Sequence, residues 1–168
     1  IRRCHNCVTT DDVKAWMRRY ADLLREADLL RARADAIRSR AASPPTSALD
    51  GLPRSPGFEG DNLGGVIGVA DALERQAAEK ASQAATAYAE IDAAIQQING
   101  KKAIEIQTAL QCRYLDGLPW AEINFLLYGD RKNFSEREDT YLHYTFNFQK
   151  QGLEALAAIL EMEEQPNE

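Results

Sequence analysis

The sequence predicts an all-α fold, in which a long antiparallel, coiled-coil-like helical hairpin is followed by a three-helix helix-turn-helix module. Residues 11–41 contain no Pro or Gly and carry apolar residues at heptad spacing. Residues 66–98 repeat apolar residues at intervals of three and four. Nine of the thirteen aromatic residues lie between positions 114 and 148, which indicates a second, separate core. No segment has the alternating pattern of a strand.

The first long helix is expected over residues 11–42. Thr9 and Thr10 supply N-cap side chains, and Asp11 and Asp12 place negative charge in the first turn. A helix of this length spans about 45–50 Å and needs a partner helix of similar length to bury its apolar seam. The heptad positions are Val13, Trp16, Tyr20, Leu23, Ala27, Leu30, Ala34 and Ile37.

The second long helix is expected over residues 66–98 and ends at Asn99-Gly100, where a left-handed cap is easily formed. Residues 43–65 hold four Pro and five Gly and are predicted to form a flexible loop, so residues 9–98 make the hairpin. Because two helices alone bury little apolar surface, we expect a homodimer through the long helices. The second apolar stripe comprises Val66, Ala70, Leu73, Ala77, Ala81, Ala84, Tyr88, Ile91, Ile95 and Ile98.

The C-terminal module is expected over residues 101–162, with helices at 101–115, 119–127 and 139–162. Asp116-Gly117 predicts a tight turn, Pro119 a first helical residue, and Gly129 a left-handed cap. Trp120 is interpreted as a core anchor whose loss costs about 3–5 kcal/mol. The third helix is expected to bury Leu142, Phe146, Leu153, Leu156 and Leu160, with a second packing stripe of Tyr141, Tyr144 and Phe148.

The run from Leu110 to Ile123 carries a specific pattern, in which the matching residues are Leu110, Arg113, Tyr114, Leu115, Gly117, Trp120, Glu122 and Ile123. Here the chain resembles the phage and prophage RinA/ArpU-like transcriptional regulators, whose C-terminal part is similar to region four of bacterial sigma factors. The resemblance covers nearly the whole chain after Val8, with the long helix, loop and second long helix in the same order. Two features depart from the family pattern: Asn124, where a small residue is usual, and the ten-residue insert 130–139.

The resemblance implies a regulator that binds double-stranded DNA in the cytoplasm of a bacterial host cell, with long helices that dimerise or contact the transcription machinery, including RNA polymerase. In a helix-turn-helix, the opening turns of the recognition helix enter the major groove. Asn147 is suited to bidentate pairing with adenine. The expected groove residues are Thr140, His143, Tyr144 and Asn147, and the expected phosphate contacts are Arg131, Lys132, Arg137 and Lys150.

Charge limits the affinity of a single module for DNA. Residues 101–160 hold seven basic and eight acidic residues, and the whole chain has 20 basic and 26 acidic residues, a net charge of −6. A nearly neutral module binds a polyanion weakly unless a dimer doubles the contacts. The arginines of the first long helix alternate with acidic residues, which is typical of a solvated coiled-coil surface.

Other classes of site lack support in the sequence. Cys4-His5-Asn6-Cys7 has the spacing of half a zinc site, but no second pair follows, so no metal or cofactor is expected. No catalytic motif appears, and no apolar stretch is long enough to predict a membrane span. Two alternatives to a regulator stay open: a helical interaction protein with a degenerate helix-turn-helix, and a small DNA-packaging recognition subunit.

Overall fold

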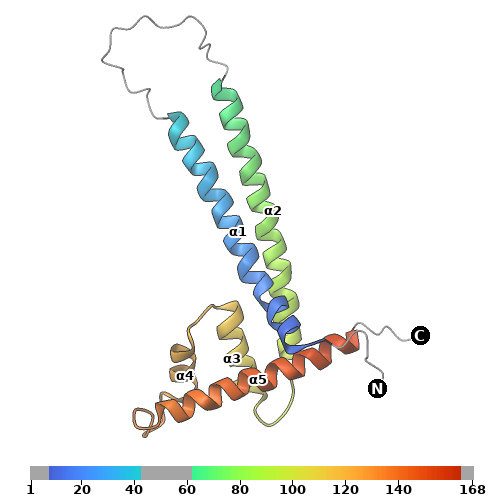
Figure 1. Cartoon of the computed structure of the whole chain (residues 1–168), viewed down its shortest axis with the longest axis vertical. Coiled ribbons are helices and arrows are strands. Elements are labelled where there is room, and N and C mark those ends of the chain that lie inside the picture. The colour runs from blue at the N-terminus through green and yellow to red at the C-terminus, as the bar shows by residue number, and fades with distance from the viewer. Residues whose placement is uncertain (1–7, 43–61, 164–168) are drawn as a thin grey trace, which may run out of the picture. The chain divides into compact units, whose positions relative to one another are not determined.

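The chain folds into helices, as the sequence predicts. The computed structural model describes residues 8–42 and 62–163, and every regular element in these two ranges is helical. A long helical hairpin is followed by shorter helices (Figure 1). Cys4–Cys7 and most of the predicted loop 43–65 lie outside the described residues. The elements are α1 (Thr10–Ala42), α2 (Asn62–Gln96), α3 (Ala103–Leu110), the π-helical turn η1 (Gln111–Leu115), α4 (Trp120–Tyr128) and α5 (Glu138–Glu163).

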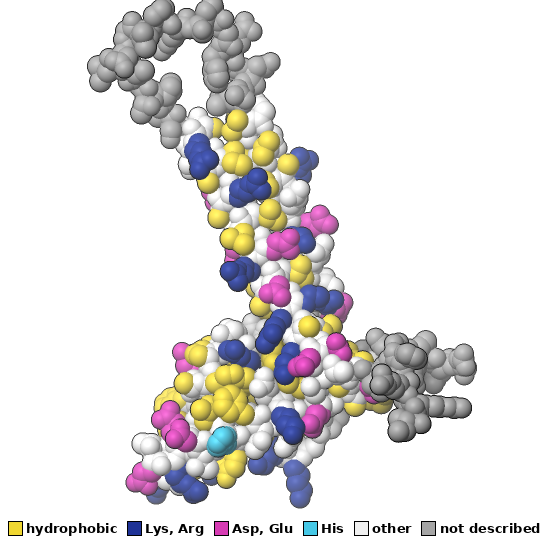
Figure 2. Space-filling view, in the orientation of Figure 1, with side chains coloured by type: hydrophobic (Ala, Val, Ile, Leu, Met, Phe, Trp, Pro, Cys, Tyr) yellow, Lys and Arg dark blue, Asp and Glu magenta, His cyan; other side chains and the backbone are white. Residues whose placement is uncertain are grey.

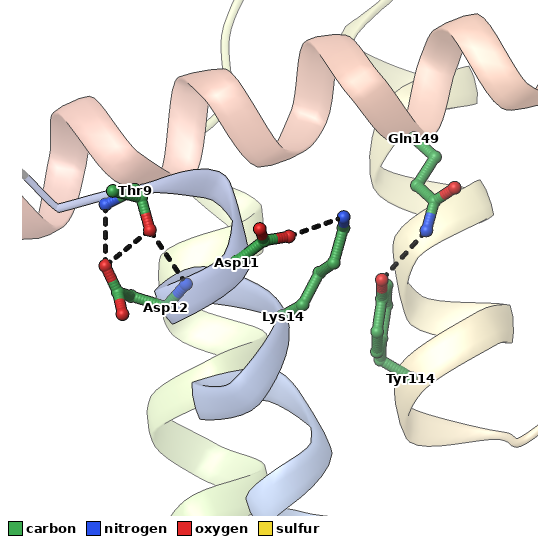
Figure 3. A network of polar contacts seen from close by, with 6 residues as sticks. All are labelled: Thr9, Asp11, Asp12, Lys14, Tyr114 and Gln149. Carbon is green, nitrogen blue, oxygen red and sulfur yellow. Dashed lines mark hydrogen bonds and ion pairs between the residues drawn. The ribbon is translucent and has the colours of Figure 1, made fainter.

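Helix α1 begins at the predicted cap. The Thr9 backbone N–H donates to Asp12 Oδ2 over 2.9 Å, and the Asp12 N–H donates to Thr9 Oγ1 over 3.2 Å, which forms a reciprocal capping box (Figure 3). The hydrogen bonds from the Thr9 hydroxyl and N–H stabilise the carboxylate and lower the pKa of Asp12. Asp11 also pairs with Lys14 over 2.9 Å. Thr9 is therefore the residue that fixes the start of the hairpin.

The chain divides into two compact units, and residues 23–83 form the first. In this unit, α1 and α2 pack through small residues with no exposed surface, namely Ala27, Ala34, Ala70 and Ala77. Ion pairs close the edges of the seam: Arg38 pairs with Asp71 over 2.8 Å and also with Glu74, and Lys80 pairs with Glu26 over 3.0 Å. Because higher positions in α1 meet lower positions in α2, the two helices are antiparallel.

The second unit joins residues 1–22 to residues 84–168. Within its described part, the start of α1, the end of α2 and the C-terminal helices contribute to one hydrophobic core. A wider arc of α1 is buried here than the heptad predicts, so Met17 is fully buried although the heptad does not include it. Tyr88, which the stripe on α2 places inside, is 41% exposed and packs edge to face on Tyr20 instead.

Most predicted helix boundaries differ by one to four residues from those observed, and α2 ends at Gln96 rather than at residue 98. Helix α2 begins at Asn62 rather than at residue 66, because glycines at 64 and 65 weaken a helix by about 1 kcal/mol each but do not stop it. Pro119 is the N-cap of α4, with an extended ψ of 153°, and not its first helical residue. The left-handed cap predicted at Gly129 is wrong: its φ is −56°, and its N–H bonds to the Phe125 carbonyl over 2.6 Å.

The buried face of α5 also differs from the prediction. Phe148 is 3% exposed and lies in the core, whereas Phe146 is 40% exposed and packs edge to face on Trp120 at 5.3 Å between ring centroids. Further along α5, Gly152 lacks a side chain, which lets the helix approach Leu110 and Ile106 of α3 closely. Leu153 and Leu156 of the predicted stripe are buried as expected, so the difference is confined to the beginning of the helix, at Phe146. Trp120 is accordingly partly exposed at the edge of the core, and its loss should cost less than the predicted 3–5 kcal/mol.

Candidate nucleic-acid interface

The first turns of α5 present a continuous polar face to solvent. Four predicted DNA-contacting residues on this helix are exposed, and Asn147 lies three or four positions from each of the others: His143, Tyr144, Asn147 and Lys150. Thr140 begins the face and is half-buried. The opposite side of the same helix is buried through Thr145, Phe148 and Gly152. The structure thus places the predicted groove residues together on one side of α5.

The motif residues before α4 fold the turn that leads into it. Gly117 has a φ of +71°, a conformation that favours glycine, and the Leu118 N–H donates to the Cys112 carbonyl over 2.8 Å across the turn. Arg113 donates to the Leu118 carbonyl over 3.1 Å and lies 5.3 Å from the centre of the Trp120 ring. Arg113 therefore connects the end of the preceding helix to the start of α4, which gives this part of the motif a structural role.

A π-helical turn precedes the motif's tight turn and was not predicted. In η1 the Asp116 N–H donates to the Gln111 carbonyl over 3.0 Å, five residues back. The extra residue in this turn brings both Tyr114 and Leu115 into the core. The Tyr114 hydroxyl then accepts a hydrogen bond from Gln149 Nε2 over 2.9 Å, which ties η1 to the middle of α5 (Figure 3).

Asn124 is a buried polar link between α4 and α5. It is 1% exposed, and its Nδ2 donates to the Glu138 carbonyl over 3.3 Å at the first residue of α5. Its Oδ1 accepts from the Thr145 hydroxyl over 3.2 Å, and that hydroxyl also approaches the Tyr141 carbonyl at 3.1 Å. Asn124, which stands out in the sequence only as a departure from the family pattern, thus fixes how α5 begins against α4. Thr145 was not singled out by the sequence.

Removal of this link is expected to weaken the junction between α4 and α5. Asn124→Ala leaves a cavity, removes the hydrogen bond to the Glu138 carbonyl and takes one acceptor from the Thr145 hydroxyl, so we expect it to lower the free energy of unfolding by about 1–3 kcal/mol, measured by urea denaturation. Thr145→Val keeps the side-chain shape and the hydrogen bond between Asn124 and the Glu138 carbonyl and removes only the hydroxyl, so we expect a smaller loss. Equal stability of Asn124→Ala and the parent protein would show that the link is not important.

Aromatic rings hold the insert between α4 and α5 in place. The Phe134 ring packs edge to face on Phe125 at 5.8 Å and stacks on Tyr141 at 6.0 Å, and Tyr141 in turn stacks on Tyr128 at 4.7 Å. The Tyr141 hydroxyl donates to Asn133 Oδ1 over 2.8 Å. Burial among these rings raises the pKa of Tyr128. The insert is therefore a packed part of the module.

The insert carries three predicted phosphate contacts, Arg131, Lys132 and Arg137, and all three are exposed. Four acidic residues lie in the same stretch: Asp130, Glu136, Glu138 and Asp139. Figure 2 likewise shows basic and acidic side chains beside one another on the visible face. Gln151 and Glu154, which were not among the predicted contacts, are also exposed, and helical spacing places them on the same face as Asn147. The interface is polar with a mixed charge.

Other kinds of site find little support in residues 8–42 and 62–163. Cys112 is a buried thiol, and burial raises its pKa, so it is a poor nucleophile. No group of three or more His, Cys, Asp or Glu side chains in these ranges is arranged to hold a metal ion. None of the helices in the same ranges is long and apolar enough to cross a membrane.

Comparisons with protein-family models, curated proteins and solved structures gave no match.

Proposed function

We propose that this protein is a DNA-binding transcriptional regulator of phage or prophage origin that reads double-stranded DNA with the first turns of α5. The observation that carries the proposal is the exposed polar face of α5, held against α4 by a buried link. Asn147, at the centre of that face, has the amide geometry that pairs with adenine in the major groove. His143 and Tyr144 lie one turn before it.

The phosphate contacts come from the sides of this face. Arg131, Lys132 and Arg137 belong to the packed insert that leads into α5, and Lys150 lies one turn beyond Asn147. Phosphate contacts position a module on the duplex, and base contacts specify the sequence. Because nearby acidic residues offset the positive charge of these basic residues, one module binds DNA weakly. Self-association through the long helices doubles the number of contacts, and the regulator acts as a homodimer in the cytoplasm of the host, where RNA polymerase is a further partner.

The salt dependence of DNA binding tests the phosphate contacts. Lys132→Gln is expected to weaken binding to all duplex sequences alike and to reduce the slope of log affinity against log salt concentration by about one unit. Fluorescence anisotropy with a labelled duplex from 25 to about 200 mM salt measures both. Lys101→Gln is the matched control, since Lys101 is also exposed but lies before α3. An unchanged slope in the Lys132 variant would remove this residue from the interface.

A specific observation favours a second function, protein interaction. Helix α4 exposes Phe125 and Leu126 in the lining of a groove that also includes the acidic residues Glu122 and Asp130. Carboxylates repel phosphates, so this surface is suited to a protein partner rather than to DNA. The two functions are compatible, because the groove is formed by α4 and the residues that flank it, whereas the predicted base contacts belong to α5.

A further inference from the structure

A mostly apolar groove whose lining includes two acidic residues is formed by α4 and the residues that flank it. It has a volume of about 620 Å³ and is lined by Leu118, Ala121, Glu122, Phe125, Leu126, Gly129 and Asp130. We call it the α4 groove. Phe125 is 64% exposed and Leu126 57%, so two large apolar side chains face solvent on one short helix. Glu122 and Asp130 are the charged residues of the lining, and both are exposed.

The outer face of α1 carries a feature of the opposite charge. Leu29 is 63% exposed, and Arg25 and Arg33 lie four residues before and after it, on the same side of the helix. We call these three residues the α1 ridge. Helical spacing places it on the side of α1 opposite Ala27 and Ala34, which are buried against α2.

The arginines of the α1 ridge differ from others on the same helix. Arg19, Arg31 and Arg38 are each in an ion pair with a carboxylate. Arg25 and Arg33 are exposed, and neither is ion-paired with any residue in the described ranges. The sequence predicts a single solvated surface for the arginines of α1. The structure separates them into those that close the hairpin or pair along the helix and those that are available to a partner.

We propose that the α4 groove of one molecule binds the α1 ridge of a second copy of this chain. Leu29 fills the apolar floor formed by Phe125 and Leu126, while the two arginines pair with Glu122 and Asp130 at its edges. This is the helix-in-groove mode of recognition, with charges that fix the position of the bound helix. The proposal rests on the self-association proposed above and does not depend on DNA binding.

The spacing of the charges supports this pairing. Arg25 and Arg33 are eight positions apart in α1, which corresponds to about 12 Å along the helix axis. Glu122 and Asp130 are also eight positions apart, and the chain between them is helical to Tyr128 and keeps a helical φ of −56° at Gly129. Each acidic residue therefore meets one arginine when the two helices lie side by side. Every copy carries both the groove and the ridge, so a second copy supplies the complementary surface for each of them.

Charge reversal on each side separately is the test. Glu122→Arg with Asp130→Arg makes the groove basic, and Arg25→Glu with Arg33→Glu makes the ridge acidic. All four residues are exposed, so the variants are expected to fold, which far-UV circular dichroism and thermal melting check. By sedimentation equilibrium at micromolar concentration, we expect each variant alone to self-associate at least about tenfold more weakly than the parent chain, because like charges then face each other.

A mixture of the two variants distinguishes this contact from a general effect of charge. In a mixed pair, the basic groove meets the acidic ridge and the acidic groove meets the basic ridge, so both contacts are complementary. We expect the mixture to associate within about threefold of the parent affinity, a difference well below the tenfold that corresponds to 1.4 kcal/mol. Leu29→Asp is expected to weaken association like the charge variants, and reversal of two exposed acids outside the groove, Glu136→Arg with Glu154→Arg, to leave it unchanged.

The possible results separate this inference from the proposed function. If the parent chain is dimeric and both charge variants remain dimeric, the contact between groove and ridge is wrong, while dimerisation through the long helices stands. If the variants dissociate but the mixture does not recover, the two surfaces do not meet. A parent chain that is monomeric at micromolar concentration overturns both this inference and the proposed dimer, and leaves DNA binding to be judged by its own measurements.

Discussion

Replacement of Leu110 by alanine is expected to lower the free energy of unfolding by about 2–5 kcal/mol. Leu110 has no exposed surface, ends α3 where the π-helical turn begins, and contacts the backbone of α5 at Gly152. Its removal leaves a cavity between the two helices that form the centre of the C-terminal module. The surrounding helices are fixed by further hydrogen bonds, including the one between Gln149 and Tyr114, so they cannot simply close the gap.

Urea denaturation followed by circular dichroism measures this loss. Ile104→Ala is the matched control, because Ile104 lies in the same helix and is 76% exposed. We expect the control to change stability by less than about 0.5 kcal/mol. Similar stability of the two variants would mean that α3 does not pack on α5 as described.

Replacement of Gly152 by valine is the second large effect we expect. A Cβ atom at this position would lie 2.6 Å from Leu110 Cδ1 and 2.9 Å from Ile106 Cγ2, closer than any normal contact. Overpacking of this kind costs about 1–3 kcal/mol, and the further methyl groups of valine add to it. Either α5 moves away from α3 or both side chains leave their preferred rotamers.

Gly68→Val provides the control for Gly152→Val. Gly68 is also inside a helix, but a Cβ atom there would have no neighbour within 4 Å. Because valine is a better helix former than glycine, the control should be as stable as the parent or up to about 0.7 kcal/mol more stable. Differential scanning calorimetry measures the melting temperatures of the Gly152→Val and Gly68→Val variants. A Gly152 variant that gains stability as the control does would contradict the close approach of the helices.

The sequence was informative where periodicity decides the structure. The stripe from Ala70 to Ile98 and the seam around Ala27 and Ala34 predicted the hairpin, and Thr9 and Asp12 predicted where it begins. These features depend on local spacing and capping, both of which can be read along one chain. The turn at Gly117 was predictable for the same reason, since a glycine between two helices marks a positive φ.

The features that were missed depend on contacts between distant segments. Asn124 and Thr145 are 21 positions apart, and no local pattern indicates that they share a hydrogen bond. Gly152 carries no side chain, so the hydrophobic pattern could not show that α5 approaches Leu110 at this point. The inner stripe also included Phe146, which is 40% exposed, whereas Phe148 of the second packing stripe is buried as a packing residue. The predicted exposure of His143 and Asn147 did not depend on the contact at Gly152, because both residues lie on the side of α5 away from α3.

A selection from random duplex DNA tests the central proposal, that the first turns of α5 read base sequence. At low salt, the parent protein is expected to enrich a defined motif, and Asn147→Ala is expected to lose the preference at one position of it, a change of about 1–3 kcal/mol in discrimination. Competition binding between selected duplexes that differ at that position measures this discrimination for each protein. No enrichment above non-specific binding, or an identical preference in the Asn147 variant, would contradict DNA reading by this face of α5.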